Sequence, residues 1–558
     1  MAKCLIIALD GATLDLLAPW MEAGHLPLLK RLFDEGAGGV LRSTVPWATP
    51  TAFASFATGT NPGKHGVFDF GELIKDDYTA FVPTNGAHIK QPTLWRILSD
   101  AGKRCLVVNM PMTYPAETIE GHIVAGIPYP GDSPRLCHPP HLLDELRGKG
   151  WDLSLNSSDD LGGTYEQYYQ GLVELVQNRA AGTVHLIEEH DPEAVFVHFL
   201  ETDQVQHRYW IFMEGEQRFQ ADGPHRDAIL RLFQECEKAM EQIITAAGDP
   251  MVCVMSDHGF GPMRHQVWLN NWLRHNGYLT LRSGPGVWLK QVIYRLGLSP
   301  ASIREKLPER LKMSLLQFFE RQKGRAIAEV SGEGESATRK NLVDWITERL
   351  AIDFHDVDWN QTQAFSTGTT AVGYVWLNVA GRDPQGIVQP DSNYLAVRRE
   401  IAGKLEGWDA VGEVLMREAV WQGPEVVHAP DLVVRWAQGS TDARFFQTRF
   451  SSHHLMKAVP NDSACHRQDG MFVFSGQDVL AGKSVNADLM DLPPTLLWLL
   501  DLPVPDNMDG RVLTECFSME RPVETVAASI EERDNEIALS EEDEAAIMAS
   551  LKGLGYIE

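Results

Sequence analysis

Short, continuously hydrophobic runs recur along the chain between longer segments of mixed polarity. Five of them are rich in Val, Ile or aromatic residues and cover 5–9, 105–108, 194–200, 251–255 and 471–474. Continuous rather than alternating hydrophobicity is typical of strands that are covered on both faces of a sheet. We therefore predict that these runs form buried strands.

The segments between the runs carry hydrophobic residues three or four positions apart, as at Leu26, Leu29 and Leu32. This spacing predicts amphipathic helices. Strands that alternate with helices predict an α/β fold with a central, mostly parallel sheet. Ligands of such folds bind beyond the carboxyl ends of the strands, so polar residues that directly follow the hydrophobic runs are the first candidates for a functional site.

One segment, 281–325, departs from the pattern because Lys and Arg are dense in it, and a linker-like Gly/Ser/Glu stretch follows at 331–336. We predict a basic helical cap inserted into the core, although a solvated helical face would show the same pattern. Near the acidic end of the chain, residues 540–543 resemble a helix-capping box. The predicted division is a first core part at 1–280, the cap and linker at 281–345, a second core part at 346–520, and an acidic tail or helix at 521–558.

The composition narrows the class of protein. The chain has 558 residues, of which 44% are hydrophobic, so it can bury a large core. Its formal net charge of -27 disfavours binding to nucleic-acid polymers and anionic membranes. The seven scattered cysteines form no C-x-x-C pair, which is typical of reduced thiols. No hydrophobic stretch approaches the roughly 18 residues of a membrane span, and we expect a cytoplasmic protein.

The first two candidate site residues are a carboxylate and a hydroxyl. Asp10 follows the first hydrophobic run and precedes Gly11, a pair that by itself more often marks only a turn. Thr49 precedes Pro50 in a segment that predicts a helix ending at Gly59, with Thr49 as its N-cap residue. A hydroxyl at a helix N-terminus faces free N–H groups, which favours phosphate binding, although such a residue often only caps the helix.

Two further candidates pair a carboxylate with an imidazole. Asp203 and His207 follow the run 194–200 and are four residues apart, so one helical turn would direct both side chains toward one metal ion. This spacing also occurs by chance. Asp257 and His258 are adjacent at the end of another run, where the following glycine would let both turn toward one cation.

The last candidate is His466, which lies just ahead of the run 471–474. His453 and His454 compete with it, although their surroundings resemble a surface loop. A single histidine is more often structural than a ligand, so this assignment depends on the whole set.

Together the candidates supply three carboxylates, three imidazoles and one hydroxyl. They are Asp10, Thr49, Asp203, His207, Asp257, His258 and His466. Such a set would serve two divalent metal ions, and it suits Zn²⁺, with Mn²⁺ as the alternative because no thiolate takes part. Two cations about 4 Å apart can activate a hydroxyl nucleophile and hold the attacking and leaving oxygens of phosphorus.

The order of these motifs resembles the alkaline phosphatase superfamily, and within it the type I phosphodiesterase/nucleotide pyrophosphatase branch. The resemblance covers residues 10–511 and is strongest around the candidate residues and at 58–66. It implies an alkaline-phosphatase-like three-layer sandwich with a central, mostly parallel sheet and an inserted cap. The C/S-x-P-x-R motif of the sulfatases is absent at 49–53, which disfavours sulfate ester hydrolysis.

Carried over by position, the resemblance implies a role for each candidate. One metal ion would be held by Asp203, His207 and His466. The other would be held by Asp10, Asp257, His258 and Thr49. Thr49 would also be the nucleophile and would form a covalent phosphoryl-threonine that water then hydrolyses. Two in-line displacements imply net retention at phosphorus.

We therefore expect a two-metal phosphodiester hydrolase that acts on a small phosphoester, such as a nucleotide or a related diester. A phosphomonoesterase or a phosphomutase of the same superfamily is the alternative. A non-catalytic protein that holds the ions only for folding is a third reading. The leaving group and the oligomeric state have no signature in the sequence.

Overall fold

The computed structural model describes most of the chain. The described residues are 2–74, 77–131, 133–151, 164–213, 223, 225–295, 352–367, 372–437, 443–445, 450, 455–458, 464–528 and 539–553. His453, His454, the linker at 331–336 and most of the predicted cap lie outside them.

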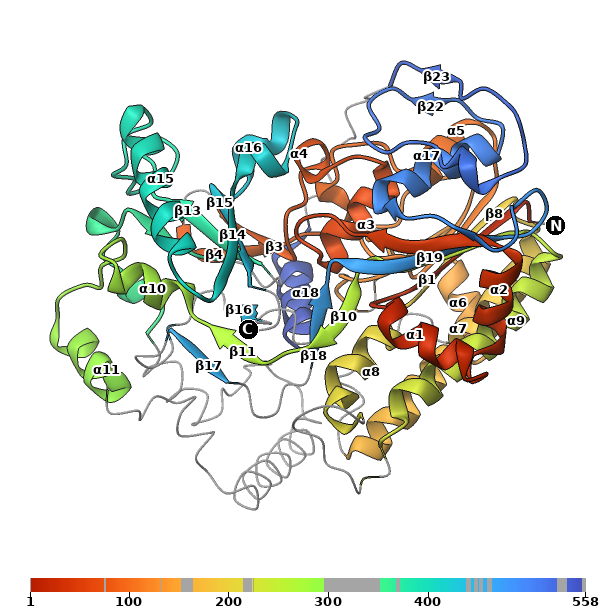
Figure 1. Ribbon diagram of the computed structural model, residues 1–558, viewed down its shortest axis with the longest axis horizontal. Coiled ribbons are helices and arrows are strands. Elements are labelled where there is room, and N and C mark those ends of the chain that lie inside the picture. Colours follow the sequence, from red (N-terminus) through yellow and green to blue (C-terminus); the bar gives the residue numbers. More distant parts are fainter. Residues whose placement is uncertain are drawn as a thin grey trace, which may run out of the picture.

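A ten-stranded sheet forms the centre of the larger lobe (Figure 1). Its strands are β1 Cys4–Leu9, β2 Ala37–Arg42, β5 Cys105–Val108, β6 Gly121–Val124, β7 Cys137–His138, β8 Ala194–Phe199, β9 Met251–Met255, β19 Asp469–Ser475, β20 Lys483–Ser484 and β21 Ala487–Asp488. The order is β20-β2-β19-β9-β1-β8-β5-β6-β7, with β21 beside β2. Strand β1 is parallel to β8 and β9, whereas β19 is antiparallel to β9 and β2. All five predicted strands are confirmed within this sheet.

Alternate residues of the central strand enter two different cores. Leu5, Ile7 and Leu9 of β1 belong to one core and Ile6 and Ala8 to the other, and all are fully buried. The first core includes helices α1 Leu14–Glu22, α2 Pro27–Glu35, α6 Leu142–Gly148, α7 Tyr165–His190, α8 Glu201–Tyr209 and α9 Ala228–Ala247. The second includes α3 Thr49–Thr58, α5 Leu94–Asp100 and α17 Leu492–Leu499. Helices thus cover both faces of the sheet, which confirms the predicted three-layer α/β architecture.

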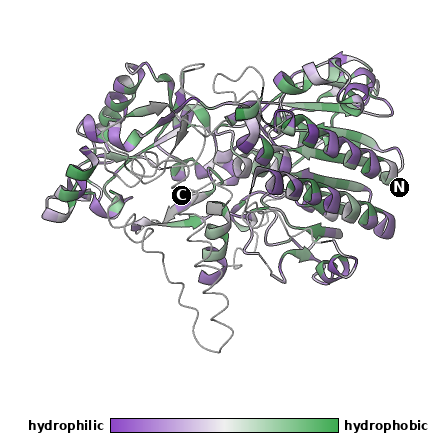
Figure 2. Cartoon of the chain, turned by 90° about the horizontal axis from the view of Figure 1, so that it is seen from below, coloured by the Kyte–Doolittle hydropathy of each residue, from purple (hydrophilic) through white to green (hydrophobic). Residues whose placement is uncertain are grey.

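Helices of the protein carry both hydrophobic and hydrophilic residues (Figure 2). In α2, Leu29 and Leu32 are buried at the predicted helical spacing, while Lys30 and Asp34 form an ion pair at the surface. Burial of such apolar faces is the main stabilising contribution to the layered fold.

A second, smaller sheet lies in the other lobe (Figure 1). It is antiparallel, with the order β12-β13-β15-β14. Its strands are β12 Ala364–Phe365, β13 Gly373–Leu377, β14 Val411–Met416 and β15 Leu432–Trp436. Its core includes side chains of α10 Leu269–His275, α11 Pro285–Arg295 and α15 Ser392–Glu406.

Short strands and helices connect or flank the two lobes. These are the hairpin β3 Gly71–Ile74 and β4 Asp77–Pro83, the pair β10 Gly259–Pro262 and β18 Ala464–Arg467, the strands β11 His265–Val267, β16 Ala443–Phe445 and β17 Met456–Ala458, the pair β22 Val504–Pro505 and β23 Thr525–Val526, and the helices α4 Pro62–His65, α16 Arg417–Val420 and α18 Glu541–Gly553. Single 3-10 turns are η1 Gly86–His88, η2 Trp210–Phe212, η3 Phe354–Asp356, η4 Trp359–Gln361, η5 Pro424–His428, η6 Leu489–Asp491 and η7 Thr514–Cys516.

Helix α18 docks on the larger lobe through two fully buried side chains, Ile547 and Leu551. Asp543 of this helix forms an ion pair with Arg135 at 2.7 Å, and its backbone N–H donates to the Ser540 hydroxyl at 3.1 Å. The predicted helix start at Ser540 is therefore confirmed. The four predicted domain ranges stay a prediction, since of 281–345 only the part up to Arg295 is described.

All seven cysteines are buried free thiols. Within the described ranges, no helix has both the length and the apolarity that crossing a bilayer requires. The cytoplasmic location stays a prediction.

Candidate metal centre

The candidate residues meet at the carboxyl ends of the central strands. Strand β1 ends at Leu9, and Asp10 follows it with an exposure of 0%. Gly11 then adopts a φ of +67°, and a Cβ at this position would lie 2.8 Å from the Phe260 ring. The left-handed turn and the close approach both require glycine, so the Asp-Gly pair here forms a turn and also places a buried carboxylate.

The hydroxyl candidate lies in the first turn of α3. The N-cap residue of this helix is Ala48 in extended conformation, so Thr49 is the first helical residue and the predicted N-cap position is wrong by one residue. The helix ends as predicted at Gly59, which has a φ of +67°. The side chain of Thr49 is fully buried and its Oγ1 lies 3.4 Å from His258 Nε2.

Helix α8 places Asp203 and His207 on one face. His207 Nε2 lies 3.4 Å from Asp203 Oδ1 across one helical turn. The other nitrogen of His207, Nδ1, is 3.1 Å from the carbonyl oxygen of Ala464, which orients the ring. The predicted i, i+4 arrangement is therefore present.

Strand pairing brings His466 to the same place. Strand β10 begins directly after His258 and pairs with β18 in antiparallel register, with Phe260 opposite His466. The rings of His258 and His466 stack with centroids 3.8 Å apart. A residue that is distant in the sequence thus joins the candidate set through one short antiparallel pairing.

Three donor atoms form a first triangle. The nitrogens His207 Nε2 and His466 Nε2 are 3.1 Å apart, and they lie 3.4 and 3.1 Å from Asp203 Oδ1. Tetrahedral ligands about 2.0–2.1 Å from Zn²⁺ are about 3.3 Å apart. These three atoms therefore match one face of a tetrahedral site.

A second group of donor atoms adjoins the first triangle and surrounds the Nε2 atom of His258. This nitrogen lies 3.4 Å from Asp10 Oδ1, 3.3 Å from Asp257 Oδ2 and 3.4 Å from Thr49 Oγ1. Asp203, His258 and His466 also offer donor atoms within 4.8 Å of one another. The two sets of donors are therefore contiguous and form one buried centre.

Burial and neighbouring charge shift the pKa values in this centre. Burial, together with the nearby Asp257 and Asp203, raises the pKa of Asp10 well above its usual range. Burial would also raise the pKa of Asp203, but the adjacent His207 and His466 hold it well below its usual range. Burial lowers the pKa of His258 to about 4, so this imidazole is neutral at pH 7, which is the form that binds metals.

The donor set fits divalent cations. Asp10 Oδ1 and Asp257 Oδ2 are buried and accept no hydrogen bond, although each lies near His258 Nε2. Buried carboxylate oxygens without a donor are costly unless a cation approaches them. The seven predicted residues are thus brought together, and their oxygen and imidazole donors could bind divalent metal ions.

Two polar residues that the sequence pattern did not indicate contact Asp10. His198 Nε2 lies 2.8 Å from Asp10 Oδ2, and the Thr202 hydroxyl donates to the Asp10 carbonyl oxygen at 2.7 Å. His198 lies inside strand β8 rather than after it, so a search of strand ends passes over it. The one feature of the sequence that could have indicated His198 is that it is the single polar residue of an otherwise apolar, buried strand.

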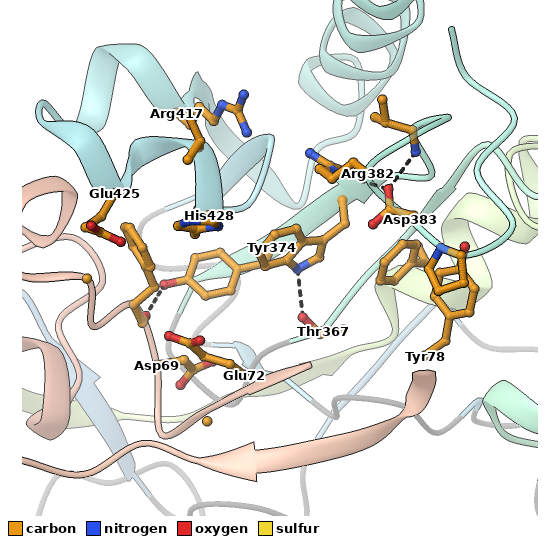
Figure 3. A pocket seen from close by; sticks show the side chains of 18 of the residues that line it. Asp69, Glu72, Tyr78, Thr367, Tyr374, Arg382, Asp383, Arg417, Glu425 and His428 are labelled. Carbon is orange, nitrogen blue, oxygen red and sulfur yellow. Dashed lines mark hydrogen bonds and ion pairs between the residues drawn. The ribbon is translucent and has the colours of Figure 1, made fainter. Parts of the chain in front are cut away.

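A cavity of about 1010 Å³ lies apart from this centre, between the hairpin β3–β4 and the smaller sheet, and none of the seven candidate residues lines it (Figure 3). Many of its polar groups already have protein partners. The Tyr374 hydroxyl donates to the Phe68 carbonyl, the Trp376 indole donates to Thr367 Oγ1, and Arg382 is paired with Asp383. These contacts hold part of the cavity wall in place.

Comparison with protein families matches residues 4–410 to the type I phosphodiesterase / nucleotide pyrophosphatase family. The chain belongs to this family. The predicted resemblance is confirmed, and as a type I phosphodiesterase family member the protein is a hydrolase of phosphoric ester bonds. The family is metal-dependent, in agreement with the buried donor set.

Two solved structures have a similar fold. Phosphonoacetate hydrolase from Sinorhizobium meliloti 1021, in complex with phosphonoacetate, has a TM-score of 0.50 at 15% identity, covering 90% of this chain and 95% of that chain. An inactive variant of murine ectonucleotide pyrophosphatase/phosphodiesterase 5, in complex with AMP, has a TM-score of 0.50 at 11% identity, covering 93% of this chain and 100% of that chain. Both support the alkaline-phosphatase-like fold. A comparison of this chain with curated protein sequences found no match.

Proposed function

We propose that this protein is a two-metal phosphodiester hydrolase that uses Thr49 as its nucleophile. The observation that carries the proposal is the position of Thr49 Oγ1, which is buried at the N-terminus of α3 and 3.4 Å from His258 Nε2. A buried hydroxyl beside donors that could bind metal ions supports a role for Thr49 as the nucleophile.

Asp203, His207 and His466 would hold one ion. Asp10, Asp257 and His258 would hold the other, together with Thr49. When bound, the two ions supply Lewis-acid stabilisation of the nucleophile, the phosphoryl oxygens and the leaving oxygen. Zn²⁺ is our first choice, because imidazole and carboxylate donors at these spacings suit it, and Mn²⁺ is the second.

The reaction would take place in two displacements at phosphorus. Thr49 Oγ1 forms a bond to phosphorus as the bond to the leaving oxygen breaks, and the hydroxyl proton leaves with the alcohol product. Water then attacks the phosphoryl-threonine from the opposite side, releases the phosphate monoester and returns a proton to Thr49. Each displacement inverts the configuration, so the net result is retention.

Helix α3 would assist this reaction electrostatically. The N-terminal end of a helix carries a partial positive charge and free N–H groups, and Thr49 and Thr51 lie in its first turn. Charge that develops on the phosphoryl oxygens during the transfer would be stabilised there. The first turn of α3 would thus provide the nucleophile and also bind the transferred phosphoryl group.

We further propose that the substrate is a small diester, such as a nucleotide or a related compound. This rests on the family and on the AMP complex of the murine relative. The identity of the leaving group would depend on surfaces beyond the metal centre.

The test is hydrolysis of bis-p-nitrophenyl phosphate beside p-nitrophenyl phosphate, after chelation and after re-addition of Zn²⁺ or Mn²⁺. We expect metal-dependent diester cleavage that Thr49→Ala reduces by about 10³-fold or more, on the order seen when a nucleophile is removed. Thr58→Ala is the matched control, because Thr58 is also buried and lies at the other end of the same helix. It should retain activity.

Faster cleavage of the monoester would contradict the diester assignment and favour a phosphomonoesterase. Full activity in Thr49→Ala would exclude a phosphoryl-threonine. Stoichiometric metal binding with no hydrolysis of either compound would favour a protein that holds the ions only for folding.

A further inference from the structure

We propose that His198 is a positioning residue, which holds the Asp10 carboxylate in the orientation that a metal ion at Asp10, Asp257 and His258 requires. This inference rests on the proposed function, because it concerns the same metal centre. It adds a residue that lies outside the predicted ligand set and that does not itself face the ion.

The two oxygens of Asp10 have different partners. Oδ2 lies 2.8 Å from His198 Nε2, whereas Oδ1 lies 3.4 Å from His258 Nε2 and accepts no hydrogen bond. Asp10 is 0% exposed and His198 is 1% exposed, so water does not compete for either contact. The Oδ2 atom is thus held by His198, and the Oδ1 atom is left to bind a cation.

The imidazole of His198 is itself held in place. It is hydrogen-bonded to the backbone of Asn109 as well as to Asp10. The Phe53 ring packs against it edge-on, with centroids 4.9 Å apart at 79°. Because packing and hydrogen bonds act on different sides of the ring, its Nε2 has little freedom to move away from Asp10.

Asn109 is a rigid support for this ring. It has a φ of +54°, a conformation that Asn tolerates better than most residues. Its side chain accepts a hydrogen bond from Arg179 Nε at 3.0 Å and donates to the Ala125 carbonyl at 3.2 Å. Arg179 in turn forms a buried ion pair with Glu201. The backbone of Asn109 is therefore fixed by contacts that continue into α7 and α8.

Electrostatic repulsion explains why Asp10 needs such a contact. Asp257 is buried beside it, and the two carboxylates approach the same nitrogen, His258 Nε2, at 3.4 Å from Asp10 Oδ1 and 3.3 Å from Asp257 Oδ2. The Thr202 hydroxyl fixes only the backbone carbonyl of Asp10. On its Oδ2 side, the carboxylate is restrained by His198. Residues that orient a ligand in this way typically contribute about 10- to 100-fold to metal affinity.

The experiment compares His198→Phe with His198→Gln. Phe keeps a ring and removes the nitrogen that contacts Asp10, whereas the Gln side-chain amide can place a polar group near the position of Nε2. Zn²⁺ affinity is measured by titration against a competing chelator, in which we expect two binding steps for the wild-type protein. We expect His198→Phe to weaken one step about 10- to 100-fold and leave the other unchanged, and His198→Gln to restore most of the loss.

His65→Gln is the control, since His65 is also buried but contacts Ser55 instead of a ligand carboxylate. It should bind both ions as the wild-type protein does. If the Phe ring prevents folding, His198→Met replaces it, because Met is apolar and flexible and also lacks the ring nitrogen.

The outcomes separate this inference from the proposed function. If His198→Phe or His198→Met binds both ions like the wild-type protein, or if His198→Gln is impaired as strongly as they are, the positioning role is wrong. If the wild-type protein binds no Zn²⁺ or Mn²⁺, the proposed function itself fails. Loss of one binding step in the apolar variants with rescue by Gln supports the positioning role.

Discussion

Asp10 and Asp203 are both fully buried carboxylates, yet their pKa values shift in opposite directions. Burial and the neighbouring Asp257 and Asp203 raise the pKa of Asp10, whereas Asp203 lies within 3.4 Å of His207 and 3.1 Å of His466, which lower its pKa. Burial alone would raise both values, so the nearest charged groups decide the outcome. The surroundings of a side chain, rather than its residue type, set its protonation in this centre.

His65 gives a prediction on pH and stability. Burial lowers its pKa to about 3, and its ring nitrogens contact Ser55 Oγ at 2.8 Å and the Val67 N–H at 3.1 Å. The unfolded chain takes up a proton below about pH 6.5, and the folded protein only near pH 3. The unfolded state thus binds more protons in this window, so falling pH lowers the free energy of unfolding by up to about 1.4 kcal/mol per pH unit.

His65→Gln should therefore show a flatter pH dependence between about pH 3.5 and 6. Urea unfolding followed by circular dichroism at several pH values measures it. His25→Gln, at an exposed histidine, should keep the wild-type slope. Identical slopes in His65→Gln and the wild-type protein would show that His65 does not titrate in this way.

The residues of the site were largely predictable because chemistry-bearing side chains follow strand ends. Asp10, Asp257 and the Asp203/His207 pair all do so. His198 was not predictable, because a polar residue inside a buried strand has a partner that only the sheet register reveals. The predicted N-cap position of Thr49 was wrong by one residue. Ala48 is the N-cap residue and has the extended conformation of that position, but its side chain makes no capping hydrogen bond, so the sequence carried no signal for it.

At the scale of elements, continuous hydrophobic runs identified strands of the central sheet, because both faces of that sheet are covered by helices. The smaller sheet was not anticipated. Strand β12 has two residues, and β14 has exposed residues at Gly412 and Glu413, so neither shows a continuous hydrophobic run. Their pairing depends on contacts between distant segments.

Helix α18 offers a prediction at this scale. Ile547→Ala removes a fully buried side chain from its docked face. Replacing such a side chain by Ala typically costs about 2–5 kcal/mol. Because α18 touches the lobe along one face, we expect this cost to appear as faster amide hydrogen exchange within α18.

The control for this helix is Ala549→Gln, because Ala549 is exposed and Gln is also a good helix former. It should leave the exchange of α18 close to that of the wild-type protein. Equal protection in Ile547→Ala and Ala549→Gln would contradict the docking of α18 through Ile547.

At the scale of the whole molecule, the metal centre should couple to global stability. Ions that bind only the folded state stabilise it by about 2.7 kcal/mol at about 100 times the dissociation constant. We therefore expect chelation to lower the urea midpoint of the wild-type protein. Asp257→Asn, which removes one buried ligand, should reduce this effect of chelation. An unchanged midpoint after the ions have been removed would contradict the coupling.

The donors of this centre come from distant parts of the chain, between Asp10 and His466. At a synthesis rate of about 5–20 residues per second, at least roughly 20 seconds must pass on the ribosome between the first donor and the last. During that interval Asp10, Asp203 and Asp257 can already be present without His466. The nascent chain thus spends that interval with an incomplete set of donors.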